Sequence, residues 1–247
     1  MPDGEAAVAF ERVSFTHGSG APVLRELSLH VAPGETIALL GRSGAGKTTA
    51  LRLVNALLRP TAGKVLVAGR STAAWDVVQL RRRTGYVIQG VGLFPHLTVA
   101  QNVALVPQLE GWPAARTEVR VAELLALVGL PPAEYGARYP HELSGGQRQR
   151  VGVARALAAD PPLVLLDEPF GALDPVSRAE LQREFRGLQQ RLGKTALFVT
   201  HDVREAFRVA DRIALLADGA LVALETPAQF AASAHPAVRG FLAAEAP

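Results

Sequence analysis

The chain has 247 residues, of which 49% are hydrophobic and 20% are charged, and it contains no cysteine. This composition allows a sizeable buried core, argues against global disorder, and excludes disulfides and thiolate metal sites. The formal net charge of +3 is too small to indicate nucleic-acid binding by itself. No basic start is followed by a long apolar run, and no apolar stretch approaches the length of a membrane span. We therefore expect a cytosolic protein that meets a membrane only through a partner.

Strand and helix patterns alternate along most of the chain. Alternating or continuous apolar runs predict strands at 8–16, 23–31, 36–41, 64–69, 84–89, 163–168, 195–200 and 212–225. Helices are predicted near 46–57 and 176–192, and the pattern from about 92 to 160 is helical. Strand–helix alternation predicts an α/β protein whose sheet is mostly parallel and covered on both faces.

A glycine-rich segment follows the third predicted strand and begins a helix. It matches the phosphate-binding pattern GxxxxGK[ST], in which backbone N–H groups and a helix N-terminus surround phosphate oxygens. Lys47 is expected to reach the β and γ phosphates, and the Thr48 hydroxyl is expected to bind Mg²⁺. The residues of this segment are Gly41, Arg42, Ser43, Gly44, Ala45, Gly46, Lys47, Thr48 and Thr49.

Two acidic residues end the buried strand LVLLDE. Asp167 and Glu168 therefore lie at the carboxyl edge of the sheet, where open α/β sheets bind ligands. Taken alone, such a pair is more often a solvated loop or a helix cap. Together with the phosphate loop, Asp167 is predicted to contact Mg²⁺ indirectly and Glu168 to polarise an attacking water as a general base.

A second glycine-rich helix start lies far from the first. The segment LSGGQ at 143–147 places Ser144, Gly145, Gly146 and Gln147 at the beginning of a helix, which is again suited to an anion. One nucleotide has a single γ-phosphate, and the first loop already encloses it from one side. The second cradle is therefore expected to serve a nucleotide held by another copy of the chain.

The phosphate loop, LSGGQ and the strand ending in Asp-Glu occur in the order that is typical of one family. With them the chain resembles the ATP-binding cassette family of transporter ATPases over nearly its full length. The resemblance implies one nucleotide-binding domain with a P-loop NTPase core, an N-terminal antiparallel β-subdomain and an inserted helical subdomain. Its expected boundaries are 1–89 and 161–247 for the core with the β-subdomain, and 90–160 for the helical subdomain.

Three further positions acquire roles from this resemblance. Gln89 is implied to contact Mg²⁺ and the attacking water, and His201 to contact the γ-phosphate and orient the water with Glu168. Asp174, at the end of the loop Gly171–Asp174, is implied to couple the two sites of a dimer. ATP and Mg²⁺ are the expected cofactors, and a head-to-tail homodimer is the expected ATP-bound state.

One position departs from the family pattern. Many members place an aromatic residue, usually tyrosine, near the end of the first strand to stack on adenine. In VSFTHG the aligned position is His17, whose imidazole offers less stacking area. Phe15, two residues earlier, is the alternative aromatic residue and could instead belong to the core.

The closer resemblance is to bacterial importer ATPases of osmoprotectant or quaternary-amine uptake, including glycine betaine, choline, carnitine and proline. It rests on the segments 85–112 and 170–207. Residues Phe94 to Leu97 are expected to contact an integral membrane permease at the cytoplasmic face of the bacterial plasma membrane, although Leu93 and Phe94 could equally anchor the core. A substrate-binding protein is an indirect partner. The short C-terminal segment leads us to expect no regulatory domain.

Other classes explain the sequence less completely. An importer of an amino acid or inorganic anion would have the same motifs. DNA-repair ATPases of this type insert long coiled coils, whereas 50–143 has no sustained heptads, so no nucleic acid is expected as a partner. Arg81–Arg83 fits a solvated face. A ribosome-associated member would normally carry two cassettes, and a soluble P-loop kinase would leave LSGGQ and His201 without a role.

Overall fold

The computed structural model describes residues 6–171 and 174–245. Within them the strands form a six-stranded sheet and a four-stranded antiparallel sheet. The larger sheet contains, in spatial order, β10 (Ala220–Glu225), β9 (Arg212–Ala217), β3 (Thr36–Leu40), β8 (Thr195–Val199), β7 (Leu163–Asp167) and β6 (Thr84–Val87). The smaller sheet contains β2 (Pro22–Val31), β1 (Val8–Thr16), β4 (Ala62–Val67) and β5 (Arg70–Ser71).

The larger sheet is parallel except at one edge, where β10 runs antiparallel to β9. The run 212–225 thus forms two strands that are joined by a tight turn. Asp218 and Gly219 in this turn have φ values of 50° and 79°. Aspartate and glycine are among the residues that most readily adopt this left-handed conformation, which the favoured hairpin turns require.

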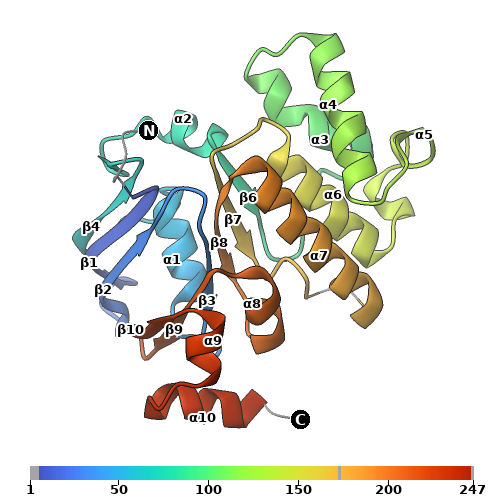
Figure 1. Cartoon of the computed structure of the whole chain (residues 1–247). Helices are drawn as coiled ribbons and strands as arrows, with labels where there is room; N and C mark the ends of the chain where they lie inside the picture. The colour runs from blue at the N-terminus through green and yellow to red at the C-terminus, as the bar shows by residue number, and fades with distance from the viewer. Residues whose placement is uncertain (1–5, 172–173, 246–247) are drawn as a thin grey trace.

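The helices lie on both sides of the larger sheet (Figure 1). They are α1 (Lys47–Val54), α2 (Val77–Arg82), α3 (Val99–Leu109), α4 (Ala114–Leu127), α5 (Pro132–Tyr135), α6 (Gly145–Leu157), α7 (Pro175–Leu192), α8 (Val203–Val209), α9 (Pro227–Ala231) and α10 (Pro236–Glu245), with a short 3₁₀ turn at Pro140–Glu142. In the described part of the chain, no helix is both long and apolar enough to cross a membrane.

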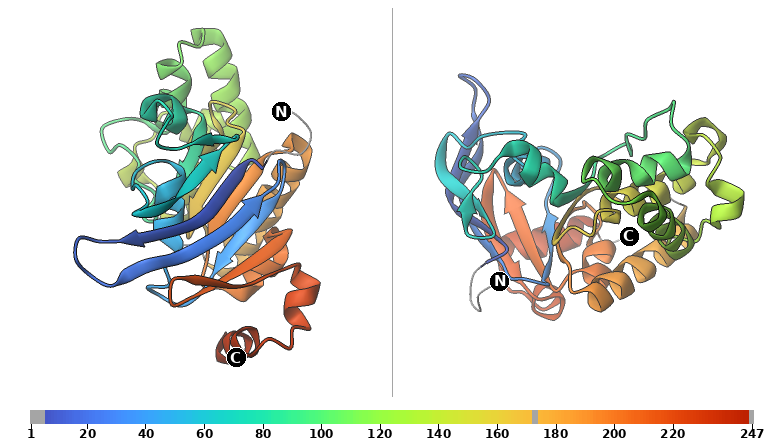
Figure 2. Two further views of the ribbon diagram at one scale, coloured as in Figure 1. Left: turned by 90° about the vertical axis from the view of Figure 1, so that its left-hand side faces the viewer. Right: turned by 90° about the horizontal axis from the view of Figure 1, so that it is seen from above.

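Alternation along the buried strands produces two cores. In β8, Phe198 packs into the core shared with α3, α4, α6, α7 and α8, whereas Leu197 packs into the core shared with α1 and the smaller sheet. Since successive side chains of a strand point to opposite faces, a buried strand fills both layers. Figure 2 shows the resulting arrangement, in which the larger sheet separates the smaller sheet from most helices.

This architecture confirms the predicted fold class, an α/β protein with a mostly parallel sheet and an N-terminal antiparallel sheet. The stretch predicted to be helical contains α3 to α6; α3, α4 and α5 lie at the upper right in Figure 1, and α6 connects them to the sheet, where it packs against β6. The subdomain boundaries at 89/90 and 160/161 stay a prediction. Strand β5 and helices α2, α8, α9 and α10 are additions that the sequence patterns did not indicate.

Candidate functional site

The glycine-rich loop connects β3 to α1 at the carboxyl edge of the parallel sheet. Gly46, the residue before α1, has a φ of 92°, and a Cβ there would come within 2.6 Å of the Leu24 side chain. Gly41 has a φ of 153°, and its Cβ would come within 2.4 Å of the Leu216 carbonyl oxygen. Both positions therefore require glycine, because a side chain would meet both backbone strain and a collision.

Lys47 turns its ammonium group back into the loop that precedes it. Its Nζ donates hydrogen bonds to the carbonyl oxygens of Gly41 and Arg42, at 2.7 and 2.9 Å. Burial lowers the pKa of Lys47, while the charges of Glu168 and Asp167 oppose that shift. The result is a fixed positive charge at the start of a helix, where the dipole also favours an anion.

A hydroxyl oxygen of Thr48 and a carboxylate oxygen of Asp167 are in contact near the Lys47 ammonium group. Thr48 Oγ1 donates a hydrogen bond of 2.9 Å to Oδ1 of Asp167, which is only 2% exposed. Burial raises the pKa of Asp167, and the hydrogen bond from Thr48 lowers it. Oxygen ligands of this kind suit Mg²⁺, which usually takes one or two protein oxygens and completes its shell with water and substrate phosphates.

Glu168 follows β7 and contacts residues of two other chain segments, those after β6 and at the end of β8. Its backbone has a φ of 50°, and its N–H donates to the Val199 carbonyl at 3.0 Å. Gln89 Nε2 donates to Glu168 Oε2 at 3.1 Å, and His201 Nδ1 lies 3.5 Å from Glu168 Oε1. A non-glycine residue in the left-handed region is strained, and such strain clusters at functional sites. The structure thus brings together the three residues predicted for water activation.

A cavity of 290 Å³ adjoins these groups. It is lined by Val23, Ser43, Gly44, Ala45, Gly46, Lys47, Thr48, Thr49, Gln89, Glu168 and His201. Of the predicted residues that do not line this cavity, Gly41 and Asp167 accept hydrogen bonds from the lining residues Lys47 and Thr48, whereas Arg42 lines a neighbouring cavity beside α10. Val23 of β2 is the one lining residue that the motifs did not identify, because no pattern marks an ordinary strand valine as a neighbour of the loop.

The second cradle forms a different cavity, of 530 Å³. Ser144 precedes α6, and its Oγ accepts a hydrogen bond from the Gln147 N–H at 3.2 Å, while the Gln147 side chain accepts one from the Ser144 N–H at 2.9 Å. This capping box defines the helix start. Ser144, Gly145, Gly146, Gln147 and Asp174 all line this cavity, and none of them lines the cavity at Lys47. Ala172 and Leu173 of the predicted loop lie outside the described residues.

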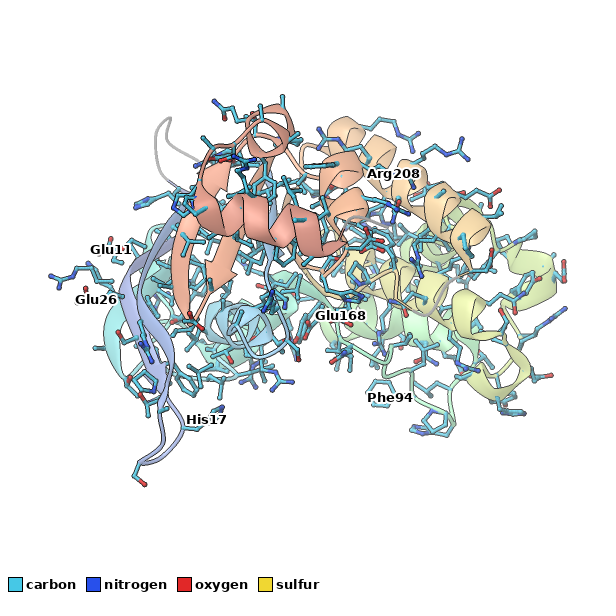
Figure 3. The ribbon with its side chains drawn as sticks, turned by 90° about the horizontal axis from the view of Figure 1, so that it is seen from below. Glu11, His17, Glu26, Phe94, Glu168 and Arg208 are labelled. Carbon is cyan, nitrogen blue, oxygen red and sulfur yellow. The ribbon has the colours of Figure 1, made fainter. Side chains whose placement is uncertain are left out.

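His17 is exposed at the outer end of the β1–β2 hairpin (Figure 3). It does not line the cavity at Lys47, and its ring packs edge-on against Phe15, with centroids 4.7 Å apart. Phe15 itself is buried in the core that includes α1. Phe15 is therefore a core residue, as the alternative interpretation of the sequence proposed. Adenine stacking on His17 stays a prediction.

Two neighbouring side chains in the segment after Gln89, Leu93 and Phe94, differ in their exposure. Leu93 is partly buried against the helical core, whereas Phe94 is 43% exposed and points away from the body of the molecule (Figure 3). The buried Asn102 holds the backbone of Phe94 through bonds of 2.8 and 3.1 Å. A groove of 290 Å³ beside Phe94 is also lined by Tyr86 and Arg155, which the sequence reasoning missed.

A glycine loop between a parallel strand and a helix, with a buried lysine and a Thr–Asp pair at its edge, defines a P-loop nucleotide-binding protein of the α/β class. The family model described as ABC transporter matches residues 24–171. The chain belongs to the ABC transporter family, which confirms the predicted resemblance.

Known relatives agree with this membership. The chain is 52% identical over 220 residues to the choline transport ATP-binding protein OpuBA of Bacillus subtilis, which covers 89% of this chain and 58% of that protein. It is 48% identical to the glycine betaine uptake system ATP-binding protein YehX of Escherichia coli, over 89% of this chain and 71% of that protein.

A solved dimeric ATP-binding cassette in a post-hydrolysis state, bound to ADP and Pi, superposes with a TM-score of 0.81 at 32% identity, over 89% of this chain and 98% of that one. The chain spans between 55% and 58% of the length of five of the curated relatives.

Proposed function

We propose that this chain is the ATP-hydrolysing subunit of a bacterial importer for an osmoprotectant or quaternary amine such as glycine betaine, choline or proline. The observation that carries the proposal is the Glu168 carboxylate, held between Gln89 and His201 at the cavity that the phosphate loop lines. The names of the two curated relatives support the class of transported solute.

The phosphate loop supplies the nucleotide-binding half of this function. The loop N–H groups and the Lys47 ammonium would hold the ATP phosphates, and the Thr48 hydroxyl with the Asp167 carboxylate would hold Mg²⁺. Bound Mg²⁺ supplies positive charge that neutralises the phosphate oxygens. The glycines permit close approach because no Cβ separates the backbone from the ligand.

Water activation falls to the group around Glu168. Its carboxylate would accept a proton from the attacking water, since it faces the cavity and lies at the end of β7. The Gln89 amide fixes one carboxylate oxygen, and the His201 imidazole lies beside the other. His201 would also contact the γ-phosphate.

The second cradle supports a homodimer. Because Ser144, Gly145 and Gly146 line a cavity separate from the one at Lys47, one chain supplies two half-sites rather than one closed site. In a head-to-tail pair, the cradle of each copy would close over the nucleotide of the other. Asp174 lines the same cradle and would lie at the contact between the two copies.

The groove beside Phe94 supports a membrane partner. Its exposed aromatic ring follows Gln89 in sequence, so a permease segment seated there would contact the loop that carries a site residue. We place the chain at the cytoplasmic face of the plasma membrane, bound to permease subunits, with a substrate-binding protein acting indirectly on the outer face.

Reconstitution with permease subunits of an osmoprotectant importer tests the proposal. ATP-dependent uptake should be measured in vesicles against quaternary amines, amino acids and inorganic anions, with the Glu168→Gln variant as the inactive control. Uptake of a quaternary amine would support the proposed solute, whereas uptake of an amino acid or anion alone would assign the chain to another importer. Absence of ATP hydrolysis in the assembled complex would contradict the ATPase function itself.

A further inference from the structure

A buried carboxylate lies behind the loop that carries His201. Glu205 of α8 is 5% exposed, and its Oε2 accepts a hydrogen bond of 2.6 Å from Thr200 Oγ1. Burial raises the pKa of Glu205, and the hydrogen bond from Thr200 opposes that shift. It is not among the predicted site residues, and it does not line the cavity at Lys47. A buried ionisable side chain is costly to retain, so its contacts are informative.

The contacts of Glu205 converge on the residues that flank His201. Thr200 Oγ1 also accepts a hydrogen bond of 3.0 Å from the Asp202 N–H, and the Thr200 N–H donates to the Leu39 carbonyl at 3.3 Å. The His201 side chain is 64% exposed. Because it has little packing of its own, the backbone on either side sets the position of its imidazole beside Glu168.

The same carboxylate faces an arginine from a different helix. Arg178 Nε lies 3.9 Å from Glu205 Oε1, and Arg178 Nη1 lies 3.8 Å from Asp202 Oδ2. The Arg178 N–H donates to the Asp174 carbonyl at 2.9 Å in the first turn of α7. Asp174 lines the second cradle, so a continuous chain of contacts runs from one half-site to the other within a single copy.

We propose that Glu205 is a positioning residue for His201, and that its pairing with Arg178 ties the placement of the imidazole to the first turn of α7. In the dimer, the cradle beside Asp174 closes over the nucleotide of the partner subunit. The pair therefore connects the partner's nucleotide to the histidine of the chain's own site. This inference rests on the proposed ATPase function and adds to it a route between the two half-sites.

Hydrogen exchange in the nucleotide-free chain tests the positioning role without any turnover. In Glu205→Gln, the amide carbonyl can still accept from Thr200, but the charge that faces Arg178 is lost. Amide exchange at 201–203 should then accelerate several-fold, while exchange in β8 stays at the wild-type rate. Unchanged exchange at 201–203 would overturn the proposal, whether or not the chain proves to hydrolyse ATP.

Steady-state kinetics of the permease complex test the link to catalysis. Glu205→Gln should lower kcat by about tenfold and change KM for ATP by less than about twofold, since the residue acts through His201 rather than on nucleotide binding. Arg178→Gln should have a similar effect, and the double variant should be no slower than the slower single variant, because the two side chains act as one unit. Effects that multiply in the double variant would overturn the pairing.

Asp211→Asn provides the matched control. Asp211 pairs at 2.6 Å with Arg186 of α7, the helix that also carries Arg178, and its carboxylate accepts a hydrogen bond of 2.8 Å from the Thr36 N–H. It lines neither the cavity at Lys47 nor the second cradle. Its loss should reduce stability without altering kcat or exchange at 201–203. If Asp211→Asn slowed turnover as much as Glu205→Gln, general loosening of α7 would explain both results and the positioning role would fall. Wild-type protein without ATPase activity would instead refute the proposed function and leave the exchange result to decide this inference.

Discussion

Thr48 and Asp167 lie 119 positions apart in the sequence, yet the Thr48 hydroxyl donates a hydrogen bond of 2.9 Å to the Asp167 carboxylate. Thr48 follows β3 through the glycine loop, Asp167 ends β7, and β8 lies between these two strands in the sheet. The pair therefore spans the carboxyl edge of three neighbouring strands. The two oxygens that we propose as ligands of a divalent cation are therefore already adjacent, and little rearrangement would be needed to place the ion.

Lys47→Ala should abolish tight ATP binding. The variant removes the buried cation that lies at the start of α1, and we expect the dissociation constant for ATP to rise by at least about tenfold, as for loss of a charge-assisted contact. Nucleotide titration by calorimetry measures the change. Lys64→Ala, at an exposed ion pair with Glu11, is the control and should bind ATP normally. Wild-type affinity for ATP in Lys47→Ala would show that the loop is not part of the nucleotide-binding site.

Glu168→Gln should accumulate as an ATP-bound dimer. The amide keeps the shape of the side chain but cannot accept the proton of the attacking water, so binding persists while hydrolysis stops. Size-exclusion chromatography with and without ATP would reveal the dimer. A variant that binds ATP normally and remains monomeric at every concentration would contradict the proposed mechanism.

Ser144→Ala should weaken that dimer. The Ser144 hydroxyl caps α6 and lines the second cradle, so its loss removes a cap of about 1 kcal/mol and, in the proposed dimer, a contact to the partner's nucleotide. Thr98→Ala removes the same type of capping box from α3 and serves as the control. In the Glu168→Gln background, analytical ultracentrifugation should show weaker association for Ser144→Ala only. Equal weakening by both variants would indicate a stability effect rather than a shared site.

Glu205→Gln should change the pH dependence of stability. Because burial raises the folded-state pKa of Glu205 above its ordinary value of 4.5, the ionised carboxylate costs stability at neutral pH. That cost disappears as pH falls through the folded pKa toward 4.5. The variant should therefore unfold at a higher temperature than wild type at pH 7, and the difference should vanish near pH 4. Global unfolding exposes the Glu205 carboxylate to water, whereas exchange at 201–203 reports local opening, so the two measurements can change in opposite directions. A constant difference across the pH range would contradict the shift.

Gly85→Ala should destabilise the fold. Gly85 lies in β6, and a Cβ there would come within 2.3 Å of the Ala156 carbonyl oxygen of α6, so the helix must move away from the sheet. We expect a loss of about 1–3 kcal/mol in the free energy of unfolding, as for other overpacked sites. Gly187→Ala in α7 meets no atom within 4 Å and should instead stabilise by about 0.5–1 kcal/mol. Urea unfolding of both variants checks the contrast.

The local chemistry of the site was predictable from the sequence, because it depends on residues that are close in the chain. The glycines around Lys47 and the acids at the end of β7 have expected roles that follow from strand and helix boundaries. The fold class followed in the same way, since apolar periodicity reports which faces are buried. Gln89 and His201 both lie beside Glu168, as the family resemblance implied from the order of the motifs along the chain.

Other features depend on contacts between distant segments, which periodicity does not report. No sequence motif marks Arg178 or Glu205, and only the packing of α7 against α8 places them together. Asn102 lies among apolar helix residues, and its bonds to the backbone of Phe94 become visible only in the folded chain. The turn at Asp218 and Gly219 carries a familiar hairpin signal, which the continuous apolar run around it obscured.

Under the proposed head-to-tail pairing, the separation of the two cavities also sets the kinetic order of ATP hydrolysis. Among the described residues, the two cavities share no lining residue, so the cradle at Ser144 lies apart from the phosphate loop of the same copy. Under the proposed pairing, turnover per chain in dilute solution rises with total protein concentration, because each event requires an encounter. A permease that binds two copies replaces that encounter with a fixed effective concentration, and turnover then becomes independent of dilution.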